Sequence, residues 1–274
     1  MTVVIKIGGA RAVEPAGALA DVATLRERAE PVAIVHGGST AVDETLERMG
    51  IEPDYVETPS GVVGRFTDAE TMDVFKMAMA GLVNTDLVTG LQGEGVSAVG
   101  LSGVDGGLLT GPRKSAVRVV EDGKKKIRRG DHSGRIEHVN AALLETLLAD
   151  GYTPVASPPM LADDGVAVNT DADRAAAAVA GALSATLVVL TDVPGIMADP
   201  DDPSTVIERV ATPDDMDGLE DAAEGFMTRK VMAATEALDG GAESVIVADA
   251  NADAPVLTAL EGGGTHILPE AIEA

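Results

Sequence analysis

Two glycine pairs follow the first two predicted strands of this 274-residue chain. The first pair closes Lys6-Ile7-Gly8-Gly9, and the second lies in His36-Gly37-Gly38-Ser39. A strand that ends in two glycines before a helix lets backbone N–H groups approach an anion, and the helix N-terminus adds its dipole. Each pair alone is a weak signal, because tight turns also use glycine. Two pairs on consecutive strands would meet at one sheet edge, where open α/β folds bind ligands, so together they predict a phosphate or carboxylate site.

Charged and polar side chains flank this predicted edge. Lys6 lies inside the apolar run Val3–Ile7, where a charge is costly unless it acts on a ligand. Asn169, Asp171 and Asp173 alternate directly before an alanine-rich segment. One of them can cap a helix N-terminus. Three such groups in succession indicate a site that binds a ligand or orients catalytic groups.

Other patterns exclude whole classes of site. The run Gly93 to Ala98 fits a dinucleotide fingerprint, but a predicted helix precedes it and a strand follows, which is the wrong context. The chain has no Walker-type phosphate loop and no cysteine, so thiolate zinc sites, disulfides and cysteine nucleophiles are excluded. The four histidines show no metal-ligand spacing, and we expect no metal bound by the protein itself.

Strand-like and helix-like segments alternate along the whole chain. Predicted strands cover 3–7, 32–35, 96–101, 154–157, 187–190, 244–248 and 266–267, with a hairpin at 117–121 and 125–129 that turns at Asp122-Gly123. Predicted helices cover 16–28, 40–49, 68–89, 140–150, 172–182, 226–238 and 256–260. Such alternation predicts an α/β protein with a mostly parallel sheet between helical layers. We place a soft boundary at Asp164–Gly165, which divides the chain into 1–165 and 166–274.

The composition is acidic and poor in aromatics. Hydrophobic residues make up 45%, aromatics only 2%, and the net charge is −25. Such a surface would repel nucleic acid and suits a cell with molar internal salt, so we interpret the source as halophilic; an acidic mesophilic enzyme is the alternative. The longest uncharged stretch, Ala175 to Thr191, is at the bottom of the membrane-spanning range, and the N-terminus lacks a signal-peptide pattern. We therefore expect a soluble cytoplasmic protein without a membrane partner.

One window reverses this charge. Between Arg113 and Arg135 nine bases face three acids, so the window is +6 while the rest of the chain is −31. The bases are Arg113, Lys114, Arg118, Lys124, Lys125, Lys126, Arg128, Arg129 and Arg135. A solvated hairpin with chance charges is one interpretation. Contact with an anionic partner or substrate is the other, and it is favoured because basic residues are scarce elsewhere.

Six motifs occur in the order typical of one family: Lys6-Ile7-Gly8-Gly9, His36-Gly37-Gly38, Arg65-Phe66-Thr67-Asp68, Asn169 to Ala176, Leu190 to Ile196, and Met227-Thr228-Arg229-Lys230. Over essentially its whole length the chain resembles the amino acid kinase family, in its acetylglutamate kinase branch. The resemblance implies a three-layer α/β/α sandwich, with an acyl-substrate lobe in 1–165 and an ATP lobe in 166–274. It also implies phosphorylation of a side-chain carboxylate by ATP with Mg²⁺, and a homodimer.

Within that branch the chain departs from ordinary acetylglutamate kinases. Asp171 stands where they typically have a second asparagine. In four features the chain resembles the carrier-dependent kinases: this change, the basic hairpin, and the segments Ser102 to Gly106 and Asp131 to Arg135. Those enzymes phosphorylate glutamate or 2-aminoadipate held on the amino-group carrier protein LysW. That carrier is small and acidic, which would explain the basic window. Two alternatives remain: a kinase of free acetylglutamate, and a non-catalytic nucleotide-binding regulator on the same fold.

The resemblance also implies roles for individual residues. Lys6 would contact the transferring phosphoryl group, Lys230 would stabilise it from the nucleotide side, and Asp173 would hold both lysines. The substrate would be bound by Gly37, Gly38, Arg65 and Asn169, with Arg65 suited to a carboxylate and Asn169 to the amide of the blocked amino group. The phosphates and ATP would contact Gly8, Gly9, Thr191, Asp192 and Gly195. The carrier would dock on Lys124, Lys125, Lys126, Arg128 and Arg129.

Overall fold

A computed structural model describes the chain except for residues 9–14, 60, 62, 122, 224–225 and 273–274. The described residues form a central sheet of 11 strands. Its main path runs β13 (Arg209–Val210), β15 (Thr265–Ile267), β14 (Ser244–Asp249), β12 (Thr186–Thr191), β1 (Val3–Ile7), β2 (Val32–His36), β10 (Thr153–Ala162), β6 (Leu109–Gly111) and β9 (His138–Val139). The strands β5 (Ala98–Gly103) and β11 (Ala167–Val168) pair with β10. The strands from β14 through β12, β1 and β2 to β10 run parallel, as the alternation predicts.

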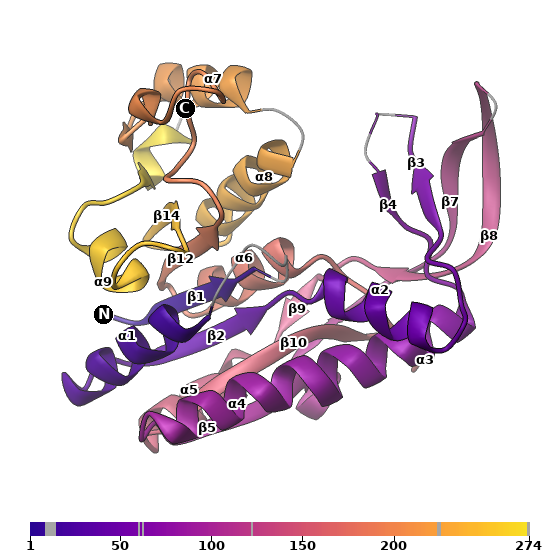
Figure 1. The fold of residues 1–274 in the computed structure, drawn as a ribbon, viewed down its shortest axis with the longest axis horizontal. Helices are drawn as coiled ribbons and strands as arrows, with labels where there is room; N and C mark the ends of the chain where they lie inside the picture. The colour runs from indigo at the N-terminus through magenta and orange to yellow at the C-terminus, as the bar shows by residue number, and fades with distance from the viewer. Residues whose placement is uncertain (9–14, 60, 62, 122, 224–225, 273–274) are drawn as a thin grey trace.

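Helices cover both faces of this sheet (Figure 1). Residues of α1 (Ala16–Glu27), α4 (Asn84–Gly93) and α9 (Pro255–Leu260) share one buried cluster with one face of the strands. Residues of α5 (Ala141–Ala149), α6 (Ala172–Ala182), α7 (Pro213–Ala222) and α8 (Phe226–Asp239) share the cluster on the other face. A smaller core lies between α2 (Ser39–Arg48) and α3 (Ala69–Lys76). The predicted three-layer α/β/α fold is therefore confirmed.

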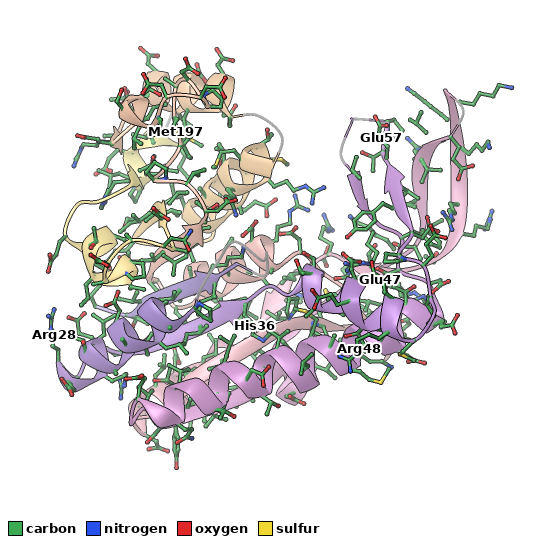
Figure 2. The ribbon with its side chains drawn as sticks, in the orientation of Figure 1. Arg28, His36, Glu47, Arg48, Glu57 and Met197 are labelled. Atoms are coloured by element: carbon green, nitrogen blue, oxygen red, sulfur yellow. The ribbon has the colours of Figure 1, made fainter. Side chains whose placement is uncertain are left out.

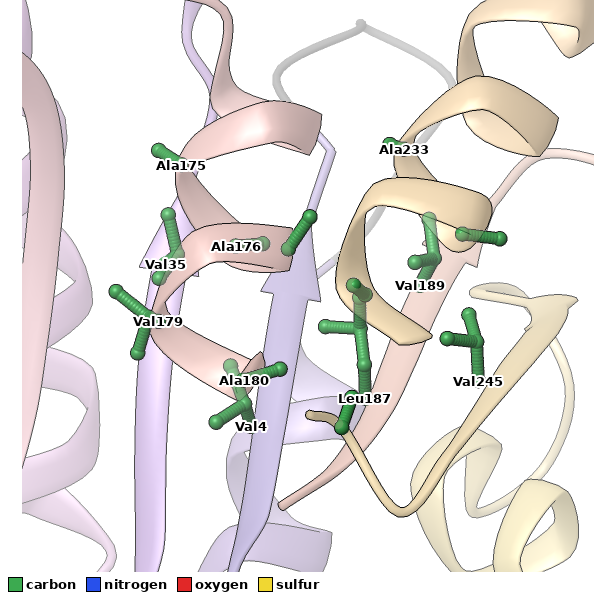
Figure 3. Close-up of a cluster of buried hydrophobic side chains, with 14 of the residues drawn as sticks. Val4, Val35, Ala175, Ala176, Val179, Ala180, Leu187, Val189, Ala233 and Val245 are labelled. Carbon is green, nitrogen blue, oxygen red and sulfur yellow. The ribbon is translucent and has the colours of Figure 1, made fainter. Parts of the chain in front are cut away.

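The layer of α6 and α8 is built from very small side chains. Ala175, Ala176 and Ala180 of α6 pack with Ala233 of α8 over the valines and leucines of the strands (Figure 3). At the far end of this helix pair the backbones nearly touch: a Cβ added to Gly181 would lie 2.8 Å from the carbonyl oxygen of Gly240. Because the side chains between α6 and α8 are so small, the two helices can approach each other closely.

The predicted helix 68–89 is longer than expected and contains a wider turn. Asp68 caps its N-terminus, since its carboxylate accepts a hydrogen bond from Thr71 N. A π-helical segment, Met77–Val83, separates α3 from α4, which ends at Gly93. Such a segment changes which side chains face the sheet. Here it is followed by Asn84, which is buried beside His36.

Two hairpins stand side by side at one end of the molecule (Figure 1). The first, β3 (Tyr55–Glu57) with β4 (Val63–Arg65), and the helix α7 were not predicted. The second, β7 (Arg113–Glu121) with β8 (Lys124–Gly134), is the predicted basic hairpin, and it is longer than expected at its base. Asp122 of its turn lies outside the described residues, and Gly123 has a φ of +72°. Short three-residue strands leave little periodicity to detect, which explains why the first hairpin was missed.

The basic hairpin has two different faces. Residues opposite one another in an antiparallel pair share a face, so Arg118, Lys125, Ile127 and Arg129 lie together; we call this set the outer face. All four are exposed, and Ile127 is 66% exposed. The other face packs inward, because Arg128 lies 3.9 Å from the Phe66 ring centroid and pairs with Asp54.

Shorter elements complete the fold. Single 3₁₀ turns lie at Asp105–Gly107, Pro203–Thr205 and Pro269–Ala271. In the part of the chain that the structure describes, no helix is both long and apolar enough to cross a lipid bilayer.

Candidate active site

The carboxyl ends of the central parallel strands meet at one edge of the sheet. Gly8, Gly37 and Thr191 lie at the ends of β1, β2 and β12, which are neighbours in the sheet. A cavity of about 1470 Å³ opens there. It brings together all predicted catalytic, substrate and ATP residues that the structure describes: Lys6, Gly8, Gly37, Gly38, Arg65, Asn169, Asp173, Thr191, Asp192, Gly195 and Lys230. Gly9, also predicted here, lies outside the described residues.

One buried carboxylate joins two lysines at the centre of this cavity. Lys6 Nζ lies 2.7 Å from Asp173 Oδ1, and Lys230 Nζ lies 3.5 Å from Asp173 Oδ2. The side chains come from β1, α6 and α8, and each is at most 14% exposed. Two cations and one anion therefore leave a net positive charge in a nearly dry place, where it acts more strongly on an anion than it would in water.

The buried charges influence one another. Burial raises the pKa of the Asp173 carboxyl, but Lys6 and then Lys230 outweigh burial, so the pKa stays below the usual aspartate value. The pKa of the Lys230 ammonium is lowered, first by burial and then by the charge of Lys6, while Asp173 opposes both effects. Asp173 thus counteracts part of the fall in the pKa of Lys230.

The start of α6 explains the alternating polar residues. Asp171 is the N-cap, and its Oδ1 accepts hydrogen bonds from Asp173 N at 2.9 Å and Arg174 N at 3.1 Å. This capping bond directs the helix N-terminus, and with it Asp173, toward the cavity. Of the three residues singled out from the sequence, Asp171 has a structural partner that accounts for it, while Asn169 and Asp173 point to ligand chemistry.

The second glycine pair is shaped by tight packing. A Cβ on Gly38 would lie 2.6 Å from Met79 Sδ and 3.2 Å from Val83, so only glycine fits without a shift of these side chains. Just before it, His36 is fully buried between Gly37 O, 2.9 Å from its Nδ1, and Asn84 Nδ2, 3.0 Å from its Nε2. Burial lowers the pKa of His36 to about 4, so the ring is neutral and supports the glycine loop without a charge.

Arg65 is held by partners that the sequence did not reveal. Its Nε and Nη2 lie 3.2 Å and 2.7 Å from Asp43 Oδ1, and Nη2 also donates to Ser39 O at 2.9 Å and to Tyr55 Oη at 3.1 Å. The guanidinium lies on the wall of the cavity, anchored along one side. An anchored guanidinium presents its charge to a carboxylate at a fixed place. Asp43 gave no signal because it looks like an ordinary acid on an amphipathic helix.

The loop after β12 forms the opposite wall. Thr191 Oγ1 donates to Asp192 Oδ1 at 3.2 Å, and Ile196 N donates to Thr265 Oγ1 at 2.8 Å. A Cβ on Gly195 would lie 2.8 Å from the same Thr265 oxygen, so the loop lies tightly against the strand β15. These contacts hold the backbone of the loop that contains the predicted ATP residues Thr191, Asp192 and Gly195.

The predicted docking residues do not line the cavity. The hairpin lines the cavity only near its base, through Lys114 and the run 133–137. The five docking residues lie farther along it: Lys124, Lys125, Lys126, Arg128 and Arg129. The five are not equivalent, because Lys126 pairs with Glu121 at 2.9 Å and Arg128 pairs with Asp54. Lys125 and Arg129, on the outer face, have no ion pair among the described residues.

The cavity is basic although the chain is acidic. Its lining contains seven bases and five acids, whereas acids outnumber bases by more than two to one in the whole chain. The bases are Lys6, Arg65, Lys114, Arg135, Arg174, Arg229 and Lys230. Within the described residues no group of three or more histidine, aspartate or glutamate side chains could hold a metal ion. The arrangement is suited to anionic ligands with several negative charges.

Comparison with known proteins agrees with this geometry. A [LysW]-aminoadipate kinase of Thermus thermophilus is 44% identical over 271 residues, which cover 97% of this chain and 99% of that protein. An acetylglutamate kinase of Methanopyrus kandleri is also 44% identical, over 237 residues that cover 85% of this chain and 89% of that protein.

A solved structure and a family model extend the comparison. An N-acetylglutamate synthase of Neisseria gonorrhoeae, solved with coenzyme A and N-acetyl-glutamate, superposes with a TM-score of 0.77 at 26% identity. The match covers 100% of this chain but only 60% of that protein. The model described as the amino acid kinase family matches residues 1–249. With six ordered motifs, the fold and a basic cavity at the expected sheet edge, the chain belongs to the amino acid kinase family.

Proposed function

We propose that this protein is an ATP-dependent kinase that phosphorylates the side-chain carboxylate of glutamate or 2-aminoadipate, while the amino group of that substrate is blocked by a small acidic carrier protein of the LysW type. The product is an acyl phosphate for arginine or lysine biosynthesis. The observation that carries the proposal is the pair of lysines, Lys6 and Lys230, on the single carboxylate of Asp173 inside a basic cavity. The carrier follows from the name of the Thermus relative, which matches along nearly its full length.

The chain's own groups account for the transfer step. An oxygen of the substrate carboxylate attacks the γ-phosphorus of ATP, a new P–O bond forms, and the bond to the ADP oxygen breaks. Such transfer depends on positioning and charge stabilisation rather than on a covalent intermediate. Lys6 neutralises charge on the transferring group, Lys230 does so from the nucleotide side, and Asp173 keeps both ammonium groups in place.

The cavity fits a nucleotide and an acyl substrate together. Its volume and its excess of bases provide space and positive potential for a triphosphate. Gly8 donates its backbone N–H to a phosphoryl oxygen, and Thr191, Asp192 and Gly195 border the nucleotide. Gly9, which lies outside the described residues, is assigned to the same phosphates from the sequence alone. Magnesium arrives with ATP and supplies charge neutralisation on the phosphates.

On the acyl side, four residues bind the substrate. Arg65 holds the α-carboxylate, and Gly37 and Gly38 donate backbone N–H groups to the side-chain carboxylate. Asn169 hydrogen-bonds to the amide of the blocked amino group. We assign the substrate lobe to 1–165 and the ATP lobe to 166–274. Asn169 and Asp173 lie just beyond the boundary, so the ligands contact residues of both lobes.

The carrier docks on the basic hairpin. Lys124, Lys125, Lys126, Arg128 and Arg129 form the docking set, and we expect Lys125 and Arg129 to contribute most because they lie on the exposed outer face without ion-pair partners among the described residues. At 1 M salt the Debye length is about 3 Å, so the attraction must come from direct contacts rather than long-range steering. Ile127, 66% exposed between these charges, offers apolar contact that salt does not weaken.

The setting and assembly are part of the same proposal. A net charge of −25 is tolerable at molar salt, which favours a halophilic cytoplasm. A homodimer would cover the exposed apolar side of the long helix, where Met77 and Leu82 are 51% and 47% exposed. Nine large hydrophobic side chains are exposed among the described residues, and the presence of two of them on a single helical segment favours an interface.

One assay tests the proposed activity. The purified protein is offered ATP, Mg²⁺ and, separately, carrier-linked glutamate, carrier-linked 2-aminoadipate and free acetylglutamate, and the acyl phosphate is trapped as its hydroxamate. We expect a carrier-linked substrate to be used with a far lower KM than free acetylglutamate. Preference for free acetylglutamate would make the protein an acetylglutamate kinase. ATP binding without any hydroxamate would make it a regulator.

A paired variant tests the docking surface. In Lys125→Gln with Arg129→Gln, the KM for the carrier-linked substrate should rise at least about tenfold while the KM for ATP stays unchanged. The matched control removes two exposed bases elsewhere, Arg28→Gln with Arg209→Gln. Figure 2 labels Arg28 at the opposite end of the molecule from the hairpins, and Arg209 lies on the edge strand β13. An equal effect of both pairs would mean that only net charge matters, and no effect of either would make the hairpin a solvated loop.

A further inference from the structure

Asn169 is oriented by a buried hydroxyl. Its Nδ2 donates to Thr67 Oγ1 at 3.1 Å, and Thr67 is fully buried. None of the hydrogen bonds among the described residues uses Asn169 Oδ1. Since Asn169 lines the cavity, its amide presents an acceptor oxygen and the second Nδ2 hydrogen. A secondary amide of a ligand needs the same two groups, one for its N–H and one for its carbonyl.

Thr67 is held in turn by a buried carboxylate at the base of the basic hairpin. Asp131 is 1% exposed, and its Oδ1 accepts a hydrogen bond from Thr67 N at 3.4 Å. Its Oδ2 accepts bonds from Ser133 N, at 3.3 Å, and from Ser133 Oγ. Arg113 donates from Nε and Nη2 to the backbone oxygen of Asp131, at 3.3 Å and 3.2 Å. Although the Asp131 carboxylate is buried, both of its oxygens accept hydrogen bonds.

A bulge in β8 turns Asp131 inward. Arg129 pairs with Ala116 and Ser133 pairs with Lys114, so one residue of β7 faces three residues of β8. Gly130 has a φ of +91°, which glycine adopts freely. Bulges commonly redirect a side chain beside an active site. Here the exposed Arg129 and the buried Asp131 are separated by this single glycine.

Backbone contacts tie the same three segments together. His132 N donates to Thr67 O at 2.7 Å, Asn169 N donates to His132 O at 2.7 Å, and Gly134 N donates to Asn169 O at 2.8 Å. These bonds fix the backbone of Asn169 whatever its side chain does. The hydrogen bond from Asn169 Nδ2 to Thr67 Oγ1 is therefore not needed to hold the backbone. Its specific effect is on the orientation of the Asn169 side-chain amide.

We propose that Thr67 and Asp131 are positioning residues for the acyl substrate: they hold the Asn169 amide so that Oδ1 and one Nδ2 hydrogen meet the amide that blocks the substrate's amino group. The inference rests on the proposed function. It assigns no catalytic step to either residue. Both act through Asn169, and neither touches the reacting atoms.

The test compares two substitutions of the same kind. Thr67→Val keeps the shape but removes the acceptor, and we expect the KM for the carrier-linked substrate to rise about tenfold, with the KM for ATP and kcat within about twofold of the parent. Thr67→Ser keeps the hydroxyl and should restore most of the affinity. Asp131→Asn, which keeps one acceptor, should give a smaller rise. The control is Thr153→Val, since Thr153 is also fully buried but its hydroxyl has no partner among the described residues.

A second readout needs no turnover. In ¹⁵N-labelled protein without ligands, the side-chain NH₂ signal of Asn169, assigned by its loss in Asn169→Asp, should shift and exchange faster in Thr67→Val but not in Thr153→Val. This readout separates the two proposals: a wild-type protein that used no carrier-linked substrate would refute the proposed function, while the NH₂ signal would still decide whether Thr67 positions Asn169.

Three results would overturn the inference. One is an unchanged Asn169 signal in a folded Thr67→Val protein. The second is an equal rise in KM for ATP and for the acyl substrate, and the third is a lowered melting temperature with both KM values unchanged. Either of the last two would make Thr67 a purely structural residue.

Discussion

Lys6 Nζ and Asp173 Oδ1 lie 2.7 Å apart, although they come from the first strand of the sheet and from the helix α6 in the second half of the chain. A buried ion pair of this kind is costly to form and strongly destabilising to break. That such a pair occurs at the end of a glycine-flanked strand therefore indicates that the positive charge of Lys6 is needed for function. The position of Lys230 beside the other carboxylate oxygen of Asp173 indicates the same.

Removing either lysine should abolish most of the turnover. We expect Lys6→Ala and Lys230→Ala each to lower kcat by at least about 100-fold, because each removes a charge placed where the transition state develops negative charge. Steady-state kinetics with circular dichroism on the same samples checks this, and Lys76→Ala, which removes an exposed lysine of α3, serves as the control. A folded variant with near-normal kcat would exclude that lysine from the mechanism.

The lowered pKa of Lys230 predicts a pH limit on catalysis. The lysine must be charged to act, so kcat should fall as pH rises through its pKa, which burial and Lys6 hold below the ordinary lysine value. Lys230→Arg stays charged to higher pH and should move this alkaline limb upward, even if its kcat is lower throughout. The measurement is kcat from about pH 7 to about pH 10 for both proteins; an alkaline limb at the same pH in Lys230→Arg would assign the titration to another group.

Arg65 should affect binding more than chemistry. Its Nε and Nη2 are used on Asp43, so a lysine could not keep that anchor and also face a ligand carboxylate. We expect Arg65→Lys to raise the KM of the acyl substrate at least about tenfold and to change kcat by less than about threefold. Arg48→Lys on the exposed side of α2 is the matched control. Collapse of kcat at an unchanged KM would show that Arg65 does something other than hold the substrate.

His36 should make stability depend on pH in mildly acidic solution. Burial lowers its pKa from 6.5 to about 4 in the folded protein, so between these values the unfolded chain binds the additional proton. Stability therefore rises with pH across that window, and about 3 kcal/mol is lost as pH falls from 6.5 to about 4. Urea unfolding at several pH values measures the slope. His36→Gln should flatten it, whereas His138→Gln, at an exposed position, should not; equal slopes in all three proteins would contradict the assignment.

Much of the site could be predicted because it depends on local rules. Paired glycines after β1 and β2, and a lysine inside an apolar strand, are visible in the sequence and lie at the predicted sheet edge. The triplet of Asn169, Asp171 and Asp173 is also visible in the sequence, and all three residues line the cavity. Which member caps the helix could not be decided, since all three are good N-cap residues and only the start of α6 selects Asp171.

The parts that escaped prediction depend on tertiary contact. Asp43 is distant in sequence from Arg65, and nothing in its neighbours distinguishes it from an ordinary surface acid. Thr67 and Asp131 lie in segments that the family resemblance singles out, but their hydrogen bonds join residues far apart in the sequence, so their effect on Asn169 could not be predicted. The helix α7 is a different case, because its signal was present: Thr212, Pro213 and Asp215 form a capping box with proline at the first turn. The π-helical segment before Asn84 has no such local signature.

The contact between Gly181 and Gly240 has a consequence for how this enzyme can vary. Asp173 and Lys230 project from the same two helices whose other ends touch there, so the side-chain volume at Gly181 sets the spacing of this ion pair. Even an added methyl group would meet the Gly240 backbone at 2.8 Å and force the helices apart. Substitutions of Gly181 would then be felt as losses of turnover, although Gly181 lies about two helical turns from Asp173 along α6.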